Sequence, residues 1–443
     1  MDYIEVTGGR QLRGGITPAA AKNSVLPLLA ATLLCDGPCT LCRVPRLADV
    51  DTSLALLAAV GASAVRRGGG VETQPVGSGA LCGQVPPALA GAMRSSVFYL
   101  APLLCRAGSV SLPLPGGCRL GPRPVDIHLE GLMAMGARAE VGADTITLRR
   151  AGRLRGADFT LRLPSVGATE TLLMAAACAD GTTVLRGAAC EPEVEDVADF
   201  LSACGASISG AGTPVVVIHG RQSLQGCRFT PLPDRIAACT YAAAAAAAGG
   251  QIELKNCRPA HFATFLSFLQ AVGCGVKIFA GEGVADVRIT RDPAIPLRGG
   301  QEVFAAGYPG FATDAAPLAA AVLLTAQGPS SVYDGLFQNR FACAAGFAAM
   351  GAAVSDRGRS LQIAGGAELH GAEVVAPDLR GGAALAVAAL AAKGQSRIGQ
   401  IGHIRRGYAH LAAELASLGA CCREKTSADR PTAAPASVVG AKS

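Results

Sequence analysis

The chain has 443 residues, of which half are apolar and 16% are charged, and its formal net charge is +6. This length predicts two or three domains, and the apolar content excludes a disordered protein. No uncharged apolar run reaches the roughly 18 residues of a membrane-spanning helix, because Leu172–Ala179 and Tyr241–Ala248 are too short. The N-terminus has no basic segment before an apolar one. We therefore expect a soluble, cytoplasmic protein without a signal peptide.

The basic residues are dispersed along the chain and are not interleaved with aromatic residues. This pattern argues against a nucleic-acid partner, and no obligate protein partner is evident. A dispersed positive charge fits a cleft that binds a small polyanion.

Taken in order, the chain begins with a predicted strand, Tyr3–Val6, and a turn before Ala21. The segment C-D-G-P-C-T-L-C then contains Cys35, Cys39 and Cys42. A zinc or redox site would need a second pair of ligands, and the sequence offers no obvious one. We therefore interpret C-T-L-C-R-V as a strand after the Gly37-Pro38 turn and predict no metal.

A repeated phrase runs through the sequence at a spacing of about 70 residues, longer than the period of a solenoid. Six helix-like apolar stretches each end in a glycine followed by a small residue, and a strand-like run usually follows. We predict that each glycine ends its helix with a positive φ, where a Cβ would be strained. These glycines are Gly61, Gly136, Gly205, Gly273, Gly351 and Gly419.

Further helices are predicted between these repeats, as at Glu170–Ala179 and Pro233–Ala248. Six compact βαβαββ units divide naturally into three plus three. Pro231–Asp234 is the best candidate for the crossing between the halves, and the Pro-, Ser- and Ala-rich segment 426–443 is predicted to be a disordered tail.

One loop concentrates reactive chemistry, the segment L-P-G-G-C-R-L-G-P-R-P-V-D at Leu114–Asp126. Its prolines and glycines exclude a helix or a central strand. Arg119 and Arg123 flank Cys118, and nearby cations favour the thiolate. Arginine also binds carboxylate and phosphate groups through two parallel hydrogen bonds. The loop therefore suggests proton transfer or nucleophilic attack on a small anionic substrate, although most free cysteines are simply small buried apolar residues.

Eleven short motifs in this order resemble those of the UDP-N-acetylglucosamine enolpyruvyl transferase family. They are A-K-N at 21–23, V-P-R-L-A-D-V-D-T at 44–52, M-R-S-S at 93–96, P-G-G-C-R-L-G-P-R-P-V-D at 115–126, S-V-G-A-T at 165–169, E-P-E at 191–193, L-P-D-R-I at 232–236, T-D at 313–314, F-Q-N-R-F at 337–341, D-L-R at 378–380 and H-I-R-R-G-Y at 403–408. The resemblance covers the chain except for its tail. It implies an α/β fold: a two-domain inside-out α/β barrel with three βαβαββ units in each domain. We place domain 1 at 22–232 and domain 2 at 1–21 and 233–425.

The resemblance also implies a reaction. The enolpyruvyl group of phosphoenolpyruvate passes to the 3′-hydroxyl of UDP-N-acetylglucosamine by addition and elimination, and phosphate is released. In the family this is the first committed step of peptidoglycan synthesis and needs neither metal nor cofactor.

Site residues are carried over by motif. Cys118 is expected to be the acid, with Asp314 as the group that accepts the hydroxyl proton. Lys22, Arg123 and Arg406 are expected to bind phosphoenolpyruvate, together with Arg380. Asn23 is expected near the reacting centre. The residues expected to hold the nucleotide sugar are Arg94, Arg123, Pro124, Val125, Asp126, Ile127, Leu163, Pro164, Ser165, Val166, Asp314 and Leu336.

Several positions depart from the family pattern. Leu163 stands where many relatives have Lys, Arg405 where Asp is frequent, and Ala312 where Pro is common. The alternatives are transfer to shikimate 3-phosphate on the same fold, and a silent paralogue that only binds a UDP-sugar. The Cys118 loop argues against the first, and the intact set of reactive residues argues against the second.

Overall fold

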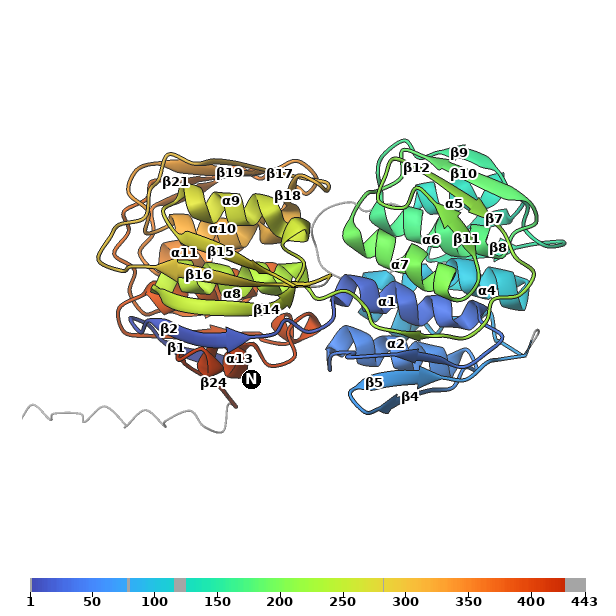
Figure 1. Ribbon diagram of the computed structural model, residues 1–443, viewed down its shortest axis with the longest axis horizontal. Coiled ribbons are helices and arrows are strands. Elements are labelled where there is room, and N and C mark those ends of the chain that lie inside the picture. The colour runs from blue at the N-terminus through green and yellow to red at the C-terminus, as the bar shows by residue number, and fades with distance from the viewer. Residues whose placement is uncertain (1, 78–79, 115–124, 282, 427–443) are drawn as a thin grey trace, which may run out of the picture.

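A computed structural model describes residues 2–77, 80–114, 125–281 and 283–426 of the chain. It forms two lobes that lie side by side (Figure 1). Cys118, Arg123 and Pro124 lie outside the described residues, as does the segment predicted as a tail, beyond its first residue, Thr426. Among the residues that the structure describes, no helix has the length and apolarity that a bilayer crossing requires.

The buried apolar side chains form two separate clusters, one in each lobe. The cluster of the first lobe draws on residues 20–224, and that of the second on residues 4–12 and 237–422. The chain passes between the lobes where Ala20 pairs with Pro233 in an antiparallel bridge. The N-terminal strand β1 (Tyr3–Thr7) matches the predicted first strand and lies in the second lobe.

The described strands form six sheets. In the first lobe these are β13-β3-β5-β4 (Arg228–Phe229, Cys39–Leu41, Gly70–Thr73, Ala64–Arg67), β6-β8-β7 (Ser109–Pro113, Thr145–Arg149, Arg138–Val141) and β11-β12-β10-β9 (Ser207–Ser209, Val215–His219, Thr182–Arg186, Asp158–Thr160). In the second lobe they are β15-β16-β14-β2 (Gly275–Ala280, Ala285–Arg291, Gly250–Cys257, Leu12–Ile16), β18-β17-β19-β21-β20 (Phe311–Ala312, Glu302–Ala306, Ser330–Asp334, Ser360–Ile363, Val354–Asp356) and β22-β23-β1-β24 (Glu373–Val375, Gln395–Gly399, β1, Cys421–Lys425).

All six sheets share one pairing pattern. A parallel pair, such as β9 with β10 or β22 with β23, is followed by two antiparallel neighbours. In the sheet of β6, the parallel partner is reduced to a single bridge between Gln84 and Ser111. A parallel pair needs a crossover connection, and a helix lies in the connection between β9 and β10 (Val166–Ala177) and between β22 and β23 (Leu379–Ala391). The six-fold repeat of the sequence therefore has a counterpart in a strand-pairing pattern that recurs from sheet to sheet.

The helices of the first lobe are α1 (Lys22–Ala31), α2 (Ala48–Ala59), α3 (Pro87–Ala92), α4 (Leu100–Ala107), α5 (Asp126–Ala134), α6 (Val166–Ala177) and α7 (Pro192–Ala203), with 3-10 turns η1 (Thr32–Leu34) and η2 (Arg94–Tyr99). Those of the second are α8 (Arg235–Ala248), α9 (Ala263–Ala271), α10 (Ala316–Leu323), α11 (Ala344–Ala349), α12 (Leu379–Ala391) and α13 (Leu411–Ser417), with η3 (Pro259–Phe262), η4 (Thr313–Ala315) and η5 (Ile404–Arg406). Helices α6 and α8 match the two predicted between the repeats.

The six predicted helix-ending glycines all have a positive φ, between 92° and 105°. Each lies two positions after the last residue of its helix, at the ends of α2, α5, α7, α9, α11 and α13. The prediction is confirmed, because the left-handed conformation lets the chain leave each helix toward the next strand. The strand predicted from Cys39 onward is shorter than expected. It stops at Leu41, since Arg43 takes a φ of 56° that a strand cannot contain.

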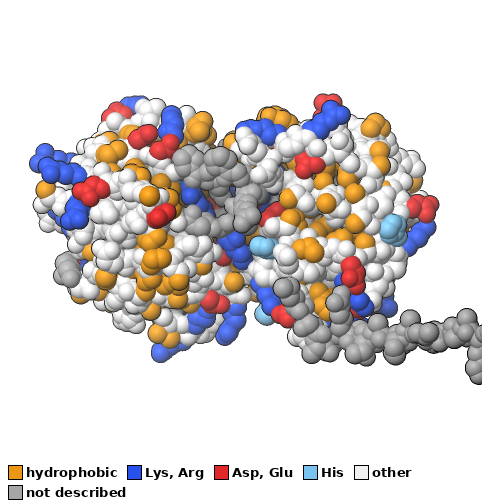
Figure 2. All heavy atoms as spheres, turned by 180° about the vertical axis from the view of Figure 1, so that it is seen from behind, with side chains coloured by type: hydrophobic (Ala, Val, Ile, Leu, Met, Phe, Trp, Pro, Cys, Tyr) orange, Lys and Arg blue, Asp and Glu red, His pale blue; other side chains and the backbone are white. Residues whose placement is uncertain are grey.

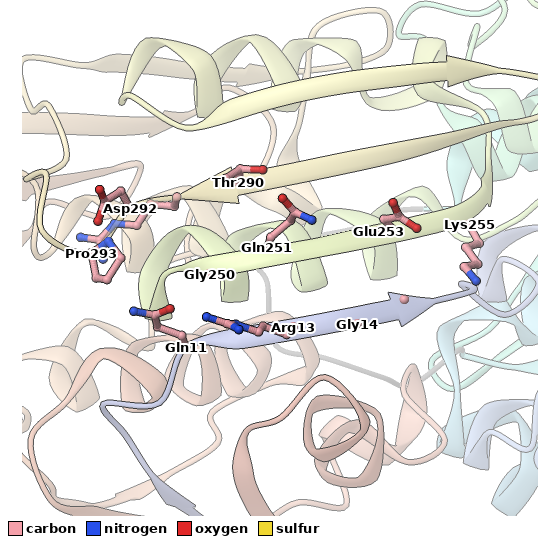
Figure 3. Close-up of a pocket in the computed structure, with 12 residues that line it drawn as sticks. Gln11, Arg13, Gly14, Gly250, Gln251, Glu253, Lys255, Thr290, Asp292 and Pro293 are labelled. Atoms are coloured by element: carbon pink, nitrogen blue, oxygen red, sulfur yellow. The ribbon is translucent and has the colours of Figure 1, made fainter.

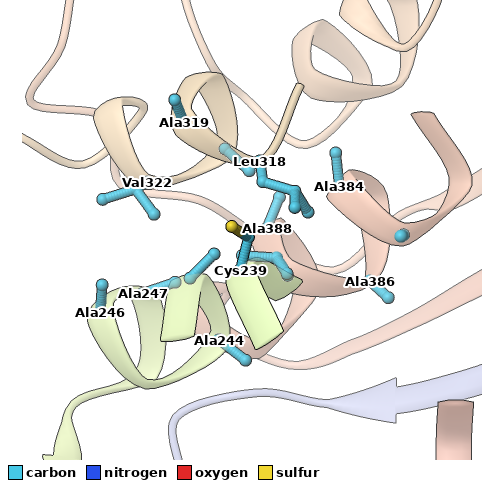
Figure 4. Packing of buried hydrophobic residues seen from close by; sticks show 14 of the residues in the cluster. Cys239, Ala244, Ala246, Ala247, Leu318, Ala319, Val322, Ala384, Ala386 and Ala388 are labelled. Carbon is cyan, nitrogen blue, oxygen red and sulfur yellow. The ribbon is translucent and has the colours of Figure 1, made fainter. Parts of the chain in front are cut away.

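Alanine-rich helices α8, α10 and α12 pack against one another at the centre of the second lobe (Figure 4). Side chains such as Ala244, Ala319 and Ala388 are fully buried between them. Small side chains let helix axes approach closely, and each alanine loses no side-chain entropy on burial. This packing explains how a chain with few aromatic residues fills its core.

Candidate active site

Lys22, the first residue of α1, lies where the two lobes meet. Its Nζ is 2.6 Å from Oδ2 of Asp49, in the first turn of α2. Its backbone N–H donates to Oδ2 of Asp234 at 3.4 Å, and Asp234 also caps α8 of the other lobe. The lysine is thus held by carboxylates from both sides of the junction.

Arg406 reaches the same carboxylate from the second lobe. Its Nε lies 2.8 Å from Oδ1 of Asp49 and its second nitrogen 3.2 Å from Oδ2, a two-point contact. Asp49 is only 4% exposed. Burial disfavours its ionised form, but Lys22 and Arg406 outweigh that effect and lower the pKa of Asp49. Asp49 therefore holds two predicted substrate-binding cations together across the junction.

Asp314 forms a second ionic cluster within the second lobe. Its Oδ2 lies 3.0 Å from Arg380 and its Oδ1 3.1 Å from Arg340. Burial opposes ionisation, yet the two guanidiniums hold the pKa of Asp314 well below its usual range. Its side chain keeps 28% of its surface exposed, so an ionised carboxylate faces the site.

A capping role is also expected for Asp314 because it precedes α10. That expectation is wrong: the N-cap of α10 is Ala315, with no side-chain cap. The carboxylate turns to the guanidiniums of Arg380 and Arg340 instead. The ionic contacts outweigh the weaker bonds to backbone N–H groups.

Buried polar groups fix these arginines. Asp334, fully buried, accepts from Arg340 at 3.2 Å and from the backbone N–H of Leu336 at 2.8 Å. Arg380 also contacts the hydroxyl of Tyr408 at 3.3 Å. The half-exposed Leu336 is thereby tied to the same network as Asp314.

The two clusters lie close enough to affect one another. Burial lowers the pKa of Lys22, Asp49 opposes that effect, and the positive charges of Arg380 and Arg406 lower the pKa further. Lys and Arg side chains gather where the lobes meet (Figure 2). Lys22, Arg380, Arg406 and Asp314, predicted from separate motifs, are thus brought together, with the exposed Asn23 beside Lys22.

The residues predicted to hold the nucleotide sugar lie mainly in the first lobe. Asp126, at the start of α5, forms an ion pair with Arg162, just before the exposed Leu163 and Pro164. Ser165 caps α6, since its Oγ accepts from the N–H of Ala168 at 3.3 Å. Helices α5 and α6 pack together, so these two predicted segments are neighbours.

Four other predicted residues of that set are also described. Arg94 begins η2 and carries a positive charge close to His128, whose pKa burial lowers to about 4. Val125 and Val166, the first residue of α6, are half-buried, and Ile127 is buried. The predicted roles of Cys118, Arg123 and Pro124 concern residues outside those described.

Two features of the site are missed by sequence reasoning. Asp49 lies in a recognised motif, but two acidic residues in a first helical turn suggest only the helix dipole. Nothing in the sequence around Tyr408 indicates its buried hydrogen bond to Thr240, in which the two oxygens lie 2.6 Å apart.

Arg405 is expected to add positive charge beside Arg406, but it is neutralised by Asp2 and Glu424, each at 2.8 Å.

A surface hollow of ≈ 700 Å³ lies elsewhere, over β2, β14 and β16 (Figure 3). Its lining includes Gln11, Arg13, Glu253 and Lys255 and contains none of the predicted site residues. Gly14 and Gly15 of β2 also line the hollow, and because glycine has no side chain they leave space on this side of the strand. We therefore place the candidate active site at the lobe junction and not in the hollow.

Comparisons with known proteins agree with this geometry. The family model for EPSP synthase (3-phosphoshikimate 1-carboxyvinyltransferase) matches residues 6–422. The UDP-N-acetylglucosamine 1-carboxyvinyltransferase of Rhodospirillum centenum is 42% identical over 95% of this chain and 98% of its own length. The chain belongs to the UDP-N-acetylglucosamine 1-carboxyvinyltransferase family. An enzyme of the same name from Desulfovibrio desulfuricans is 41% identical, over 96% of this chain and all of the relative. The family resemblance drawn from the motifs is confirmed, and members of this family are transferases.

Solved structures show the same mixed α/β fold. The enolpyruvyl transferase NikO from Streptomyces tendae matches with a TM-score of 0.84 and 26% identity, over 96% of this chain and 98% of that one. An EPSP synthase from Acinetobacter baumannii matches with a TM-score of 0.73 and 17% identity, over 96% of this chain and 100% of that one. The second likeness concerns the fold alone.

Proposed function

We propose that the chain transfers the enolpyruvyl group of phosphoenolpyruvate to the 3′-hydroxyl of UDP-N-acetylglucosamine and releases phosphate, in peptidoglycan synthesis. The observation that carries the proposal is the meeting of Lys22, Arg380 and Arg406 beside the ionised Asp314. Family membership supplies the substrates, and these residues supply suitable chemistry for them.

Phosphoenolpyruvate carries a phosphate and a carboxylate, so a site for it needs several cations. Asp49 forms ion pairs with both Lys22 and Arg406. Two cations that share one buried carboxylate cannot both be fully neutralised by it. An incoming anion therefore gains charge-assisted hydrogen bonds without having to create a new cationic site.

Asp314 accepts the proton of the sugar hydroxyl in this proposal. Its depressed pKa makes it a weak base while Arg380 and Arg340 hold both of its oxygens. An anionic substrate drawn to Arg380 would compete for that guanidinium and raise the pKa of Asp314 toward its ordinary value. The base would thus strengthen only when phosphoenolpyruvate is present.

The reaction balances with two protein groups. The hydroxyl oxygen bonds to the central carbon of phosphoenolpyruvate, Asp314 takes the hydroxyl proton, and Cys118 delivers a proton to the methylene carbon. In the tetrahedral ketal the Cys118 thiolate then takes a proton back from the methyl group as the carbon–oxygen bond to phosphate breaks, and the proton held by Asp314 leaves with the phosphate. Positioned acids and bases of this kind contribute about 10²–10⁴-fold each.

The nucleotide sugar is proposed to lie against α5 and α6, beside residues 125–127 and 163–166. The Asp126–Arg162 ion pair joins the start of α5 to the residue before Leu163. Leu336, in the second lobe, would complete this site in the proposal. The exposed Leu163 offers apolar contact in place of a cation, so we expect one phosphate contact fewer than in relatives with Lys at this position.

We also propose that the six sheets represent six βαβαββ units in an inside-out α/β barrel, three per domain. The shared pairing pattern and the two core clusters support this proposal. Domain 1 would span 22–232, and domain 2 would span 1–21 and 233–425. The cytoplasmic location stays a prediction.

The test is phosphate release from phosphoenolpyruvate with each acceptor. UDP-N-acetylglucosamine is expected to support turnover, whereas shikimate 3-phosphate is not. Phosphate release with shikimate 3-phosphate alone would instead support transfer to that acceptor. Release with neither acceptor would indicate a paralogue that only binds a UDP-sugar.

Cys118 gives a sharper test of mechanism. Cys118→Ser should lose about 10²–10⁴-fold in kcat, because a hydroxyl is a much weaker acid, while Cys118→Asp should retain turnover. Fosfomycin, a phosphonate epoxide that alkylates the family's cysteine, should inactivate the wild type and spare Cys118→Asp. Inactivation of Cys118→Asp by fosfomycin would contradict the assignment.

A further inference from the structure

Four cysteines from two distant parts of the chain meet in the first lobe. Cys35 and Cys39 flank the Gly37-Pro38 turn, Cys204 follows the end of α7, and Cys227 precedes β13. The Sγ atoms of Cys35 and Cys204 are 3.6 Å apart, and those of Cys204 and Cys227 are 3.4 Å apart. The sulfurs of Cys35, Cys39 and Cys204 all lie within 4.8 Å of one another.

This cluster overturns the reason for expecting no metal. The sequence shows a first pair, Cys35 and Cys39, with no second pair nearby. The fold supplies that second pair from Cys204 and Cys227. The group of mutually close sulfurs holds Cys35, Cys39 and Cys204, and neither Cys42 nor Cys227 belongs to it. Cys227 adjoins the group through Cys204 alone, at 3.4 Å, so a side-chain rotation of Cys227 would bring in the fourth sulfur, whereas Cys42 of the C-x-x-C motif has no such contact with these sulfurs among the described residues.

Backbone hydrogen bonds fix the two pairs against each other. The N–H of Asp36 donates to the carbonyl of Leu224 at 2.8 Å, and that of Thr40 to the carbonyl of Cys227 at 2.9 Å. The N–H of Gln225 donates to the carbonyl of Cys204 at 2.8 Å. The thiols are thus placed by the backbone and not only by side-chain rotamers.

Two glycines allow this close approach. A Cβ on Gly37 would lie 2.7 Å from the backbone nitrogen of Gly226, and one on Gly226 would lie 2.0 Å from the carbonyl oxygen of Pro38. Only glycine fits at either position. Their presence brings the loop of Cys35 and Cys39 directly onto the segment that ends at Cys227.

We propose that Cys35, Cys39, Cys204 and Cys227 bind one Zn²⁺ ion in a structural site. Zinc–sulfur bonds of about 2.3 Å in a tetrahedron place the sulfurs about 3.8 Å apart, close to the observed 3.6 Å and 3.4 Å. A disulfide would need a sulfur separation of about 2.05 Å and would leave two thiols unused. The fifteen cysteines that the structure describes are all free thiols.

Burial indicates a structural and not a catalytic metal. Cys35 and Cys39 are 1% exposed and Cys204 is fully buried, so these three ligands leave no open position for a substrate. Cys227 is half-buried and provides the path by which an ion enters.

Binding is an exchange of protons for metal. Four thiols would release four protons to solvent as four sulfur–zinc bonds form, and no electron is transferred. The ion would tie the turn after α1 and η1, the end of α7 and the start of β13 into one unit. Since α1 begins with Lys22, the site would brace the helix that presents a substrate-binding cation.

The experiment measures metal in the full chain, purified under reducing conditions without chelator. We expect about one zinc ion per chain in the wild type. Cys204→Ser should lower that content at least about tenfold, whereas the matched control Cys42→Ser should leave it unchanged. Removal of zinc by a strong chelator should lower the Tm of the wild type and of Cys42→Ser.

A second measurement keeps the proposal testable if the Cys204→Ser variant does not fold. The metal-free wild type, titrated with Co²⁺, should develop the visible absorption of tetrahedral cobalt thiolate and saturate at about one ion per chain. Cys227→Ser, at the half-buried position, should weaken that absorption. Metal-free purified protein without cobalt thiolate absorption would overturn the proposal, as would a disulfide among these four cysteines under reducing conditions.

Discussion

Two buried carboxylates of the first lobe, Asp49 and Glu170, respond to burial in opposite ways. Asp49 is 4% exposed and Glu170 is fully buried. Lys22 and Arg406 lower the pKa of Asp49, whereas burial and the nearby acidic Glu193 and Glu191 raise the pKa of Glu170 well above its ordinary value. Neither oxygen of Glu170 has a hydrogen-bond partner.

The comparison teaches that the charges of neighbouring groups, and not the extent of burial alone, decide whether a buried carboxyl group is ionised. The same rule holds for Asp314 in the second lobe, where two arginines keep a partly exposed carboxylate ionised. The three carboxyl groups thus differ in their surroundings: Asp49 pairs with two cations, Asp314 is held by two arginines and partly exposed, and Glu170 lies in the core among acidic neighbours, which favours its neutral form.

The largest effect is expected at Asp314. Asp314→Asn keeps the size of the side chain but removes the proton acceptor, so kcat should fall about 10²–10⁴-fold. Steady-state kinetics with both substrates tests this loss. Asp356→Asn, at the exposed end of β20 in the same lobe, is the control and should behave as the wild type. A kcat of Asp314→Asn close to that of the wild type would remove Asp314 from the mechanism.

A smaller, pH-dependent effect is expected at Asp49. Asp49→Asn removes the charge that opposes the lowering of the Lys22 pKa, so Lys22 loses its proton at a lower pH. The affinity for phosphoenolpyruvate should then fall as pH rises, by about tenfold near pH 9 relative to the wild type. The profile of KM for phosphoenolpyruvate against pH tests this, and an unchanged profile would mean that Asp49 does not tune Lys22.

Glu170 should affect stability and not catalysis. Below pH 4.5 the carboxyl group is protonated in both the folded and unfolded chain. As pH rises, the unfolded chain ionises while the folded chain resists, so the folded state loses stability. Glu170→Gln removes that loss and should raise Tm by about 3 °C at pH 8. The gain should shrink toward pH 5, and an equal gain at both pH values would point to packing instead.

The smallest effect is expected at Arg405, which neighbours Arg406. Its bridges to Asp2 and Glu424 are substantially exposed, and such pairs contribute about 0–1 kcal/mol. Arg405→Ala should therefore leave kcat and KM near wild type, whereas Arg406→Ala should raise KM for phosphoenolpyruvate. Equal losses in both variants would indicate a general role of local charge.

The sequence by itself determined where several helices and the first strand of this protein lie and where six of its helices end. The six helix-ending glycines, the first strand and the alanine-rich helices α6 and α8 follow from constraints within a few residues. Ordered motifs also predicted that Lys22, Asp314 and Arg406 belong to one site.

Only the tertiary structure decided which of these groups touch. Asp49 meets Arg406 across 357 positions, and Cys35 meets Cys204 across 169. The reason is physical: periodicity and turn residues report the local backbone, whereas ion pairs and thiol contacts depend on how distant elements pack. The charge of Asp49 and the neutrality of Glu170 follow from that packing, and so does the pairing of cysteines that the C-x-x-C motif misassigns.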